Sequence, residues 1–116
     1  INLPRYFYKE SPGCLWTATE KGLYKINTIS RISEPIKIMG AEGKTLPAAY
    51  AEQIIPFVDS TLLVATREYG LLQIDRIANT ATQFKYPGDK HLFFIAYLNK
   101  LLFVFQWNYR LAVFKI

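Results

Sequence analysis

Three stretches of this chain repeat one pattern of residues. The first two are residues 13–27 and 60–75, and a more diverged third stretch covers residues 99–114. Aligning Trp16 with Leu63 and Leu102 gives spacings of 47 and 39 positions. A repeat of about 40 to 45 residues is the period of a β-propeller blade, in which each unit is one small antiparallel sheet.

Each repeat divides into short strands separated by turn residues. A leading strand is predicted at residues 6–9, 54–58 and 92–97, and a second strand at 15–19, 62–66 and 101–105. The third strand of the first unit alternates between polar and apolar residues, and fourth strands are predicted at residues 32–38 and 82–86. The sequence ends at Ile116, so the third unit is expected to lack its fourth strand.

The predicted fold class is therefore all-β, a partial β-propeller of about 2.7 four-stranded antiparallel blades. Eight Phe, eight Tyr and two Trp agree with this class because aromatic side chains suit a half-buried pleated surface. The 116 residues form a single partial propeller, with units at 1–43, 44–88 and 89–116. A closed propeller of four blades needs at least about 160 residues, so the chain is expected to be an open run of blades from a longer protein.

Local signals refine this picture. Gly22 and Gly70 fall in the second hairpin of their units, where a positive φ is needed and only glycine adopts it without steric cost. The small residues Ala18 and Ala65 indicate close approach of a neighbouring sheet. Residues 46–55 are compatible with either a short helix, ended by Pro56, or a loop between units.

Residues 13–27, Gly-Cys-Leu-Trp-Thr-Ala-Thr-Glu-Lys-Gly-Leu-Tyr-Lys-Ile-Asn, resemble the two-component regulator propeller repeat. That family pattern has a turn, a Leu-Trp pair, a small residue and Thr, then Gly-Leu-Tyr and a polar terminus. The second unit keeps this framework, with Leu63 where the family prefers Trp, and the third unit keeps only the apolar skeleton.

The resemblance implies a non-enzymatic binding and dimerising platform in the periplasmic sensor region of a membrane-anchored bacterial hybrid histidine kinase. It implies an oligosaccharide from glycan breakdown, or another small ligand, as the partner, together with self-association or packing against blades of the parent chain. The first alternative is an intracellular protein-interaction propeller of the citron-homology or WD-repeat type. The second is a glycan-cleaving enzyme whose acid and base lie outside this segment.

The sequence contains no recognisable enzyme motif, and no catalytic residue, cofactor or metal site is predicted. Cys14 has apolar strand neighbours and is interpreted as a buried thiol, and His91, in a turn-rich segment, as a surface imidazole. One residue of each type is also too few for a Cys/His zinc site. The net charge of +5 is spread evenly over both halves, which argues against a nucleic-acid partner. The longest apolar stretch, residues 92–105, is too short to span a bilayer, so no direct membrane insertion is expected.

A binding site is predicted on the propeller rim that carries the loops between second and third strands and the inter-unit loops at residues 42–44 and 89–91. These loops contain polar residues with embedded aromatics that suit sugar stacking and hydrogen bonding, namely Arg67, Tyr69, Trp107, Tyr109 and Arg110. The alternative for Trp107 and Tyr109 is packing between adjacent sheets. Trp16, Tyr8 and Tyr24 are interpreted as structural residues between sheets.

Overall fold

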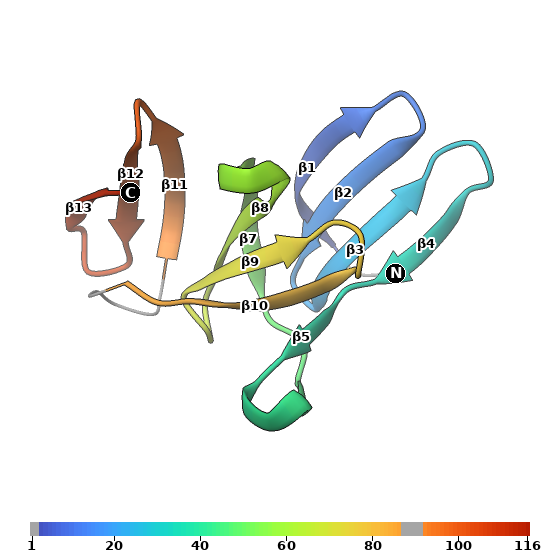
Figure 1. Ribbon diagram of the computed structural model, residues 1–116, viewed down its shortest axis with the longest axis horizontal. Helices are drawn as coiled ribbons and strands as arrows, with labels where there is room; N and C mark the ends of the chain where they lie inside the picture. Colours follow the sequence, from blue (N-terminus) through green and yellow to red (C-terminus); the bar gives the residue numbers. More distant parts are fainter. Residues whose placement is uncertain (1–2, 87–91) are drawn as a thin grey trace.

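The computed structural model describes residues 3–86 and 92–116, which form three β-sheets lying side by side (Figure 1). The first sheet contains β1 (Pro4–Ser11), β2 (Cys14–Thr19), β3 (Gly22–Asn27) and β4 (Ile32–Pro35) in chain order. The second sheet has the order β6 (Thr45–Leu46), β5 (Lys37–Met39), β10 (Thr80–Phe84), β9 (Leu71–Asp75), β8 (Leu62–Thr66) and β7 (Ala51–Pro56). The third sheet contains β11 (Leu92–Leu98), β12 (Leu101–Gln106) and β13 (Leu111–Lys115).

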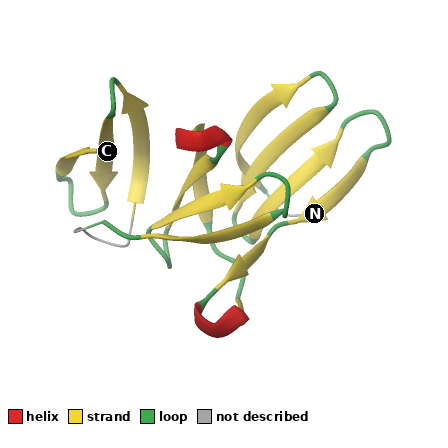
Figure 2. Ribbon diagram, in the orientation of Figure 1, coloured by secondary structure: helices red, strands yellow, loops and turns green. Residues whose placement is uncertain are grey.

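The all-β, blade-like architecture confirms the predicted fold class. Four successive antiparallel strands form the first sheet, and β7 to β10 repeat this arrangement in the second. The helix considered for residues 46–55 is wrong, because this segment ends β6, crosses a loop and begins β7. Only two single 3₁₀ turns, η1 (Ala41–Gly43) and η2 (Val58–Ser60), occur in the described residues (Figure 2).

The predicted strand at residues 32–38 is divided between two sheets. β4 pairs with β3 and ends at Pro35, whereas β5 leaves the first sheet and pairs in parallel with β10. Buried Ile36 and Ile38 hold this crossing segment in the core between the two sheets, which is a tertiary contact that local alternation cannot reveal. The unit limits at 43 and 88 stay predictions, although hydrogen bonding to the second sheet already begins at β5.

A β-bulge recurs at one place in all three sheets. The register between the first two strands shifts between Pro4 and Tyr6, between Ala51 and Gln53, and between Leu92 and Phe94. Aligning the sheets on this bulge makes Trp16, Leu63 and Phe103 equivalent, because they pair with Tyr8, Ile55 and Ala96. The sequence alignment of Leu102 with Leu63 is therefore wrong by one residue, and such a slip exchanges the two faces of a strand.

The second hairpin of each complete unit is held by its threonine. The Thr19 hydroxyl donates to the Gly22 carbonyl over 2.9 Å and accepts from the Lys21 N–H over 3.1 Å. Thr66 makes the same pair of bonds, to the Gly70 carbonyl at 2.8 Å and from the Tyr69 N–H at 3.1 Å. The predicted positive φ is confirmed at Gly22 (126°) and Gly70 (70°). The Thr and Gly of the repeat are thus parts of one turn.

Two hydrophobic clusters join the three sheets. Trp16, Ala18 and Leu23 of the first sheet pack on one face of the second sheet, and Tyr8 packs against the edge of this cluster. Leu63, Ala65 and Leu71 on the other face of the second sheet pack on the third sheet, through Leu92, Ile95, Leu102 and Val104. Ala18 and Ala65 are fully buried, as their small size predicts.

Tyr24 does not share this arrangement. It alternates with Leu23 along β3 and lies on the face of the first sheet that points away from the second sheet. There it lines a cavity of about 340 Å³ together with Phe7, Thr17 and Ile26. Within the described residues Tyr24 lies outside the two inter-sheet clusters, because period-two alternation places it on the opposite face from Leu23, and its packing between sheets stays a prediction.

Candidate functional site

Two rims of the sheets carry different sets of turns. In antiparallel sheets, the turns between second and third strands lie at one end, and those between first and second or third and fourth strands lie at the other. The first end also carries the three bulges, since Pro4 pairs with Thr19 beside the second hairpin. We call the five side chains that meet there the rim cluster: Arg5, Tyr50, Glu52, Arg67 and Trp107.

Glu52 is the centre of the rim cluster. Its Oε1 lies 3.3 Å from Nη2 of Arg5, and its Oε2 lies 3.1 Å from Nε of Arg67. The carboxylate side chain is only 5% exposed, while those of Arg5 and Arg67 are 43% and 36% exposed. Two partly exposed cations thereby neutralise the buried carboxylate. Their attraction offsets the desolvation free energy of burying its charge.

Aromatic rings flank the Arg67 guanidinium. Its central carbon lies 3.7 Å from the centroid of the Tyr50 ring and 4.9 Å from that of Trp107. The Arg5 guanidinium lies 5.5 Å from the Tyr50 ring. These distances fall within the range of cation–π attraction, so Tyr50 stabilises both guanidinium groups.

Main-chain contacts fix the segment that carries Tyr50 and Glu52. The Tyr50 N–H donates to Oε1 of Glu68 over 2.8 Å, and the Arg67 N–H donates to the Tyr50 carbonyl over 3.0 Å. The start of β7 is thus clamped to the turn between β8 and β9. Arg5 lies in β1, Glu52 in β7 and Trp107 in the turn after β12, so the rim cluster joins all three sheets.

Of the five predicted site residues, the structure brings two together. Arg67 and Trp107 meet in the rim cluster. Tyr69 instead packs partly against the core, and its hydroxyl donates to the Pro47 carbonyl over 2.8 Å. Burial and the nearby Glu68 charge raise the pKa of the Tyr69 phenol. Tyr109 and Arg110 are exposed in the β12–β13 turn, outside the contacts of the rim cluster.

Sequence reasoning missed Arg5, Tyr50 and Glu52. Arg5 and Glu52 are the extra residues of the first two bulges, and a bulge redirects the side chain of its extra residue. No periodicity marks a bulge, because its effect is to break the alternation. Tyr50 falls in the segment 46–55, for which the sequence predicts a helix or a loop and indicates no site residue.

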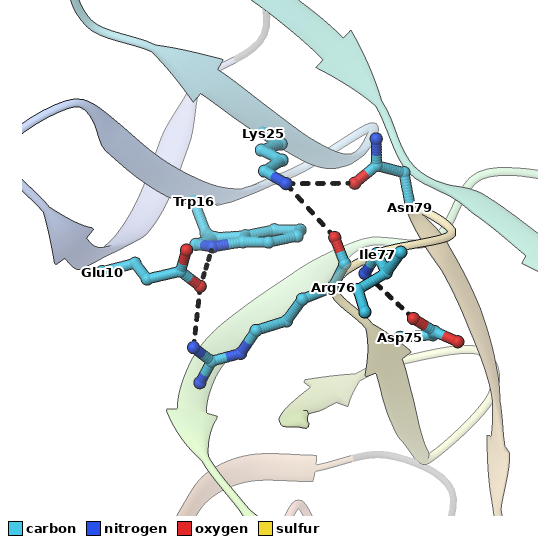
Figure 3. A network of polar contacts seen from close by, with 7 residues as sticks. All are labelled: Glu10, Trp16, Lys25, Asp75, Arg76, Ile77 and Asn79. Atoms are coloured by element: carbon cyan, nitrogen blue, oxygen red, sulfur yellow. Dashed lines mark hydrogen bonds and ion pairs between the residues drawn. The ribbon is translucent and has the colours of Figure 1, made fainter. Parts of the chain in front are cut away.

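The opposite rim holds a second polar network, which joins the first and second sheets (Figure 3). The Trp16 Nε1–H donates to Oε1 of Glu10 over 3.1 Å, and Nη1 of Arg76 donates to the same oxygen over 2.8 Å. Lys25 lies 5.0 Å from the Trp16 ring, and its Nζ donates to the Arg76 carbonyl over 3.2 Å. The structural role predicted for Trp16 is confirmed, since its ring is fully buried between the sheets.

Cys14 lies beside this network and is half-buried. Burial, followed by the negative charge of Glu10, raises the pKa of its thiol. A raised pKa opposes formation of the nucleophilic thiolate. The other candidate for acid–base chemistry, His91, lies outside the described residues, as do Asp89 and Lys90 of the predicted rim loop.

Neither a metal cluster nor a membrane helix is found in the described part of the chain. Within residues 3–86 and 92–116, no three His, Cys, Asp or Glu side chains gather closely enough to hold a metal ion. Over the same residues, no helix has the length and apolarity required to cross a membrane.

No protein-family model matches the sequence, and no curated protein matches it. Solved structures share its fold. The extracellular domain of the hybrid two-component system BT3049 from B. thetaiotaomicron superposes with a TM-score of 0.81 at 15% identity, over 99% of this chain and 17% of that one. PorZ, a surface component of the type-IX secretion system of Porphyromonas gingivalis, gives 0.75 at 16% identity, over 97% and 17%.

A more distant match is virginiamycin B lyase from Staphylococcus aureus, with a TM-score of 0.61 at 9% identity, over 100% of this chain and 44% of the lyase. The chain spans 17% of the length of the first two proteins. The expected relation to the propellers of hybrid two-component systems is confirmed at the level of the fold. Identities this low establish the fold alone, because one fold supports many functions.

Proposed function

We propose that this chain is part of a non-enzymatic binding module in the extracytoplasmic region of a membrane-anchored sensor, and that it recognises a glycan-derived oligosaccharide. The observation that carries the proposal is the rim cluster. It places two partly exposed arginines beside two aromatic rings, on a rim shared by three sheets. Aromatic faces and guanidinium donors are the groups that bind sugar faces and hydroxyls.

The fold supports the location. The extracellular domain of a hybrid two-component system matches 99% of the chain, which favours an extracellular or periplasmic position for this chain as well. No specific observation supports the intracellular alternative, a protein-interaction propeller of the citron-homology or WD type. Fractionation of cells that express the full-length protein would distinguish the two, since the proposal requires recovery with the cell envelope and accessibility to protease outside the inner membrane.

The catalytic alternative receives little support from the rim cluster. Glycosidases need one carboxyl group that can donate a proton and another that can act as base or nucleophile. Both oxygens of Glu52 are engaged by arginines, and its side chain is only 5% exposed, so neither oxygen faces a substrate. We therefore expect no cleavage when the full-length protein is incubated with mixed oligosaccharides.

Binding is tested directly with the full-length protein and a panel of oligosaccharides, by isothermal titration calorimetry. We expect one or more members to bind, and Trp107→Ala to weaken that binding by at least about tenfold. Arg31→Ala is the matched control, because Arg31 is exposed in the β3–β4 turn on the opposite rim. Equal affinities of Trp107→Ala and the parent would show that the rim cluster is not the binding site.

A further inference from the structure

We propose that the rim cluster is built to hold a carboxylate, and that the ligand is an acidic, uronate-containing oligosaccharide. This inference rests on the proposed function and names the class of its ligand. It is drawn from the way Glu52 and Tyr50 orient the two arginines and from the donor atoms that this orientation leaves available.

The hydrogen bonds of Arg67 leave one edge of its guanidinium open. Within residues 3–86 and 92–116, its side chain bonds through Nε alone, to Oε2 of Glu52 at 3.1 Å. The edge formed by Nη1 and Nη2 is therefore available. That edge offers two parallel N–H donors, the geometry that matches the two oxygens of a carboxylate.

Arg5 adds a second source of donors beside the first. It contacts Oε1 of Glu52 through Nη2, and its side chain is the more exposed of the two, at 43%. The two guanidinium groups and one carboxylate carry a net charge of +1. The Glu68 carboxylate, which accepts from the Tyr50 N–H over 2.8 Å, lies beside this group, so the attraction for a ligand carboxylate depends on the guanidinium donors and not on the net charge of the rim.

Glu52 acts as a positioning residue. Its side chain is 5% exposed and both oxygens are occupied, so it orients the arginines and has no oxygen left for a ligand. Tyr50 lies 3.7 Å below the Arg67 guanidinium and limits its rotation. Donors that are fixed before binding cost less conformational entropy when the ligand arrives.

The recurrent bulge explains why these residues converge. Arg5 and Glu52 hold the same bulge position in successive sheets, at the ends of strands that lie side by side. Since neighbouring sheets repeat the bulge at the same rim, their extra residues point to a common region. The feature is thus a property of the stacked units, and β1 and β7 each contribute one bulge residue to it.

The test compares two probes of nearly the same shape, an oligogalacturonate and its fully methyl-esterified form, by titration calorimetry on the full-length protein. We expect the acid to bind at least about tenfold more tightly than the ester, with an affinity that falls as salt is raised. Equal binding of acid and ester would overturn the inference and leave the proposed function standing. Failure of acidic and neutral oligosaccharides alike to bind would overturn both.

Variants test the assigned residues. Arg67→Gln and Arg5→Gln should each lower the affinity for oligogalacturonate about tenfold or more, and Arg67→Lys should not restore it, because an ammonium lacks the two parallel donors. Arg31→Gln, on the opposite rim, should bind as the parent does. The unfolding midpoint of each variant shows whether a loss of affinity comes from misfolding. If Arg67→Gln does not fold, Arg5→Gln still tests the inference, because Arg5 is exposed. Unchanged binding by Arg5→Gln and Arg67→Gln would overturn the assignment.

Discussion

The Arg5 guanidinium lies 3.3 Å from the Glu52 carboxylate, although the two residues belong to different sheets. They occupy the same bulge position in their own sheets, so this ion pair links two repeats through equivalent residues. Contacts between repeats, together with contacts within the second repeat, therefore determine the candidate site.

The first prediction concerns this pair. Replacing Arg5 and Glu52 by alanine, singly and together, should reveal a favourable coupling of about 0.5 to 1 kcal/mol, because Arg5 is partly solvated. Glu52→Ala alone should cost more than Arg5→Ala, since it leaves two arginines without their carboxylate. Urea unfolding followed by circular dichroism gives the free energies, and the pair Arg31→Ala with Glu52→Ala should be additive. A zero coupling for Arg5 and Glu52 would contradict the prediction.

The second prediction concerns the hairpin threonines. Thr66→Val keeps the shape of the side chain but removes the bonds to Gly70 and Tyr69, so it should lower the free energy of unfolding by about 1 to 3 kcal/mol. Thr19→Val should behave alike, because its two bonds are equivalent. Thr82→Val, at an exposed position of β10, is the control and should change stability by less than about 0.5 kcal/mol. Equal effects at Thr66 and Thr82 would refute the role.

The third prediction concerns glycine conformation. Gly22 has φ of 126°, and an added Cβ would lie 3.4 Å from that of Ala48. Gly22→Ala should cost about 1 to 3 kcal/mol, because this backbone region is strained for any residue with a Cβ. Gly13→Ala is the control, since Gly13 lacks a positive φ and its added Cβ would make an ordinary 3.5 Å contact with Ile29. The midpoint of thermal unfolding should be much lower for Gly22→Ala than for Gly13→Ala. The reverse order would be incompatible with the structure.

The fourth prediction concerns the outward face of the third sheet. Leu111 is 61% exposed, whereas its equivalents Leu23 and Leu71, which pair with Ala18 and Ala65, are buried at 2% and 0%. Phe94 and Val113 extend this apolar face. Such a face favours packing against a further sheet, so the isolated chain should self-associate as its concentration rises.

Sedimentation equilibrium measures this association. Leu111→Lys should shift the chain toward monomer, because a charge cannot be buried cheaply in the new contact. Ile77→Lys is the matched control, since Ile77 is 96% exposed but lies in the turn between β9 and β10. Equal association of both variants would show that the third sheet is not the contact surface.

The fifth prediction concerns pH. Burial and Glu10 raise the pKa of the Cys14 thiol in the folded state, so the folded protein retains this proton at pH values where the unfolded chain has lost it. The associated stability is complete below the ordinary thiol pKa of about 8.5 and is lost as pH rises through the folded value. Cys14→Ala should show a smaller decline in unfolding free energy over the same range. The difference in ultraviolet absorbance between the parent and Cys14→Ala follows the thiolate titration, and an ordinary midpoint would contradict the prediction.

Much of the fold was predictable because its signals are local. Alternation along β3, the turn at Asn99 and Lys100, and the glycines of the second hairpins all act over a few residues. Asn27 and Asp75, the polar ends of the two complete repeats, each accept two main-chain N–H bonds from the following turn. Such bonds depend on residue type and position, which the sequence displays directly.

The rest was decided by contacts between distant segments. β5 joins β10 some 40 positions along the chain, and Arg5, Glu52 and Trp107 meet from three sheets. Bulges create this meeting, and a bulge interrupts the alternation by which a strand is recognised. By itself, the sequence determined the strands, their turns and the repeat. Only the tertiary structure decided which side chains share a rim. Their meeting depends on how the sheets stack, and local periodicity carries no information about that stacking.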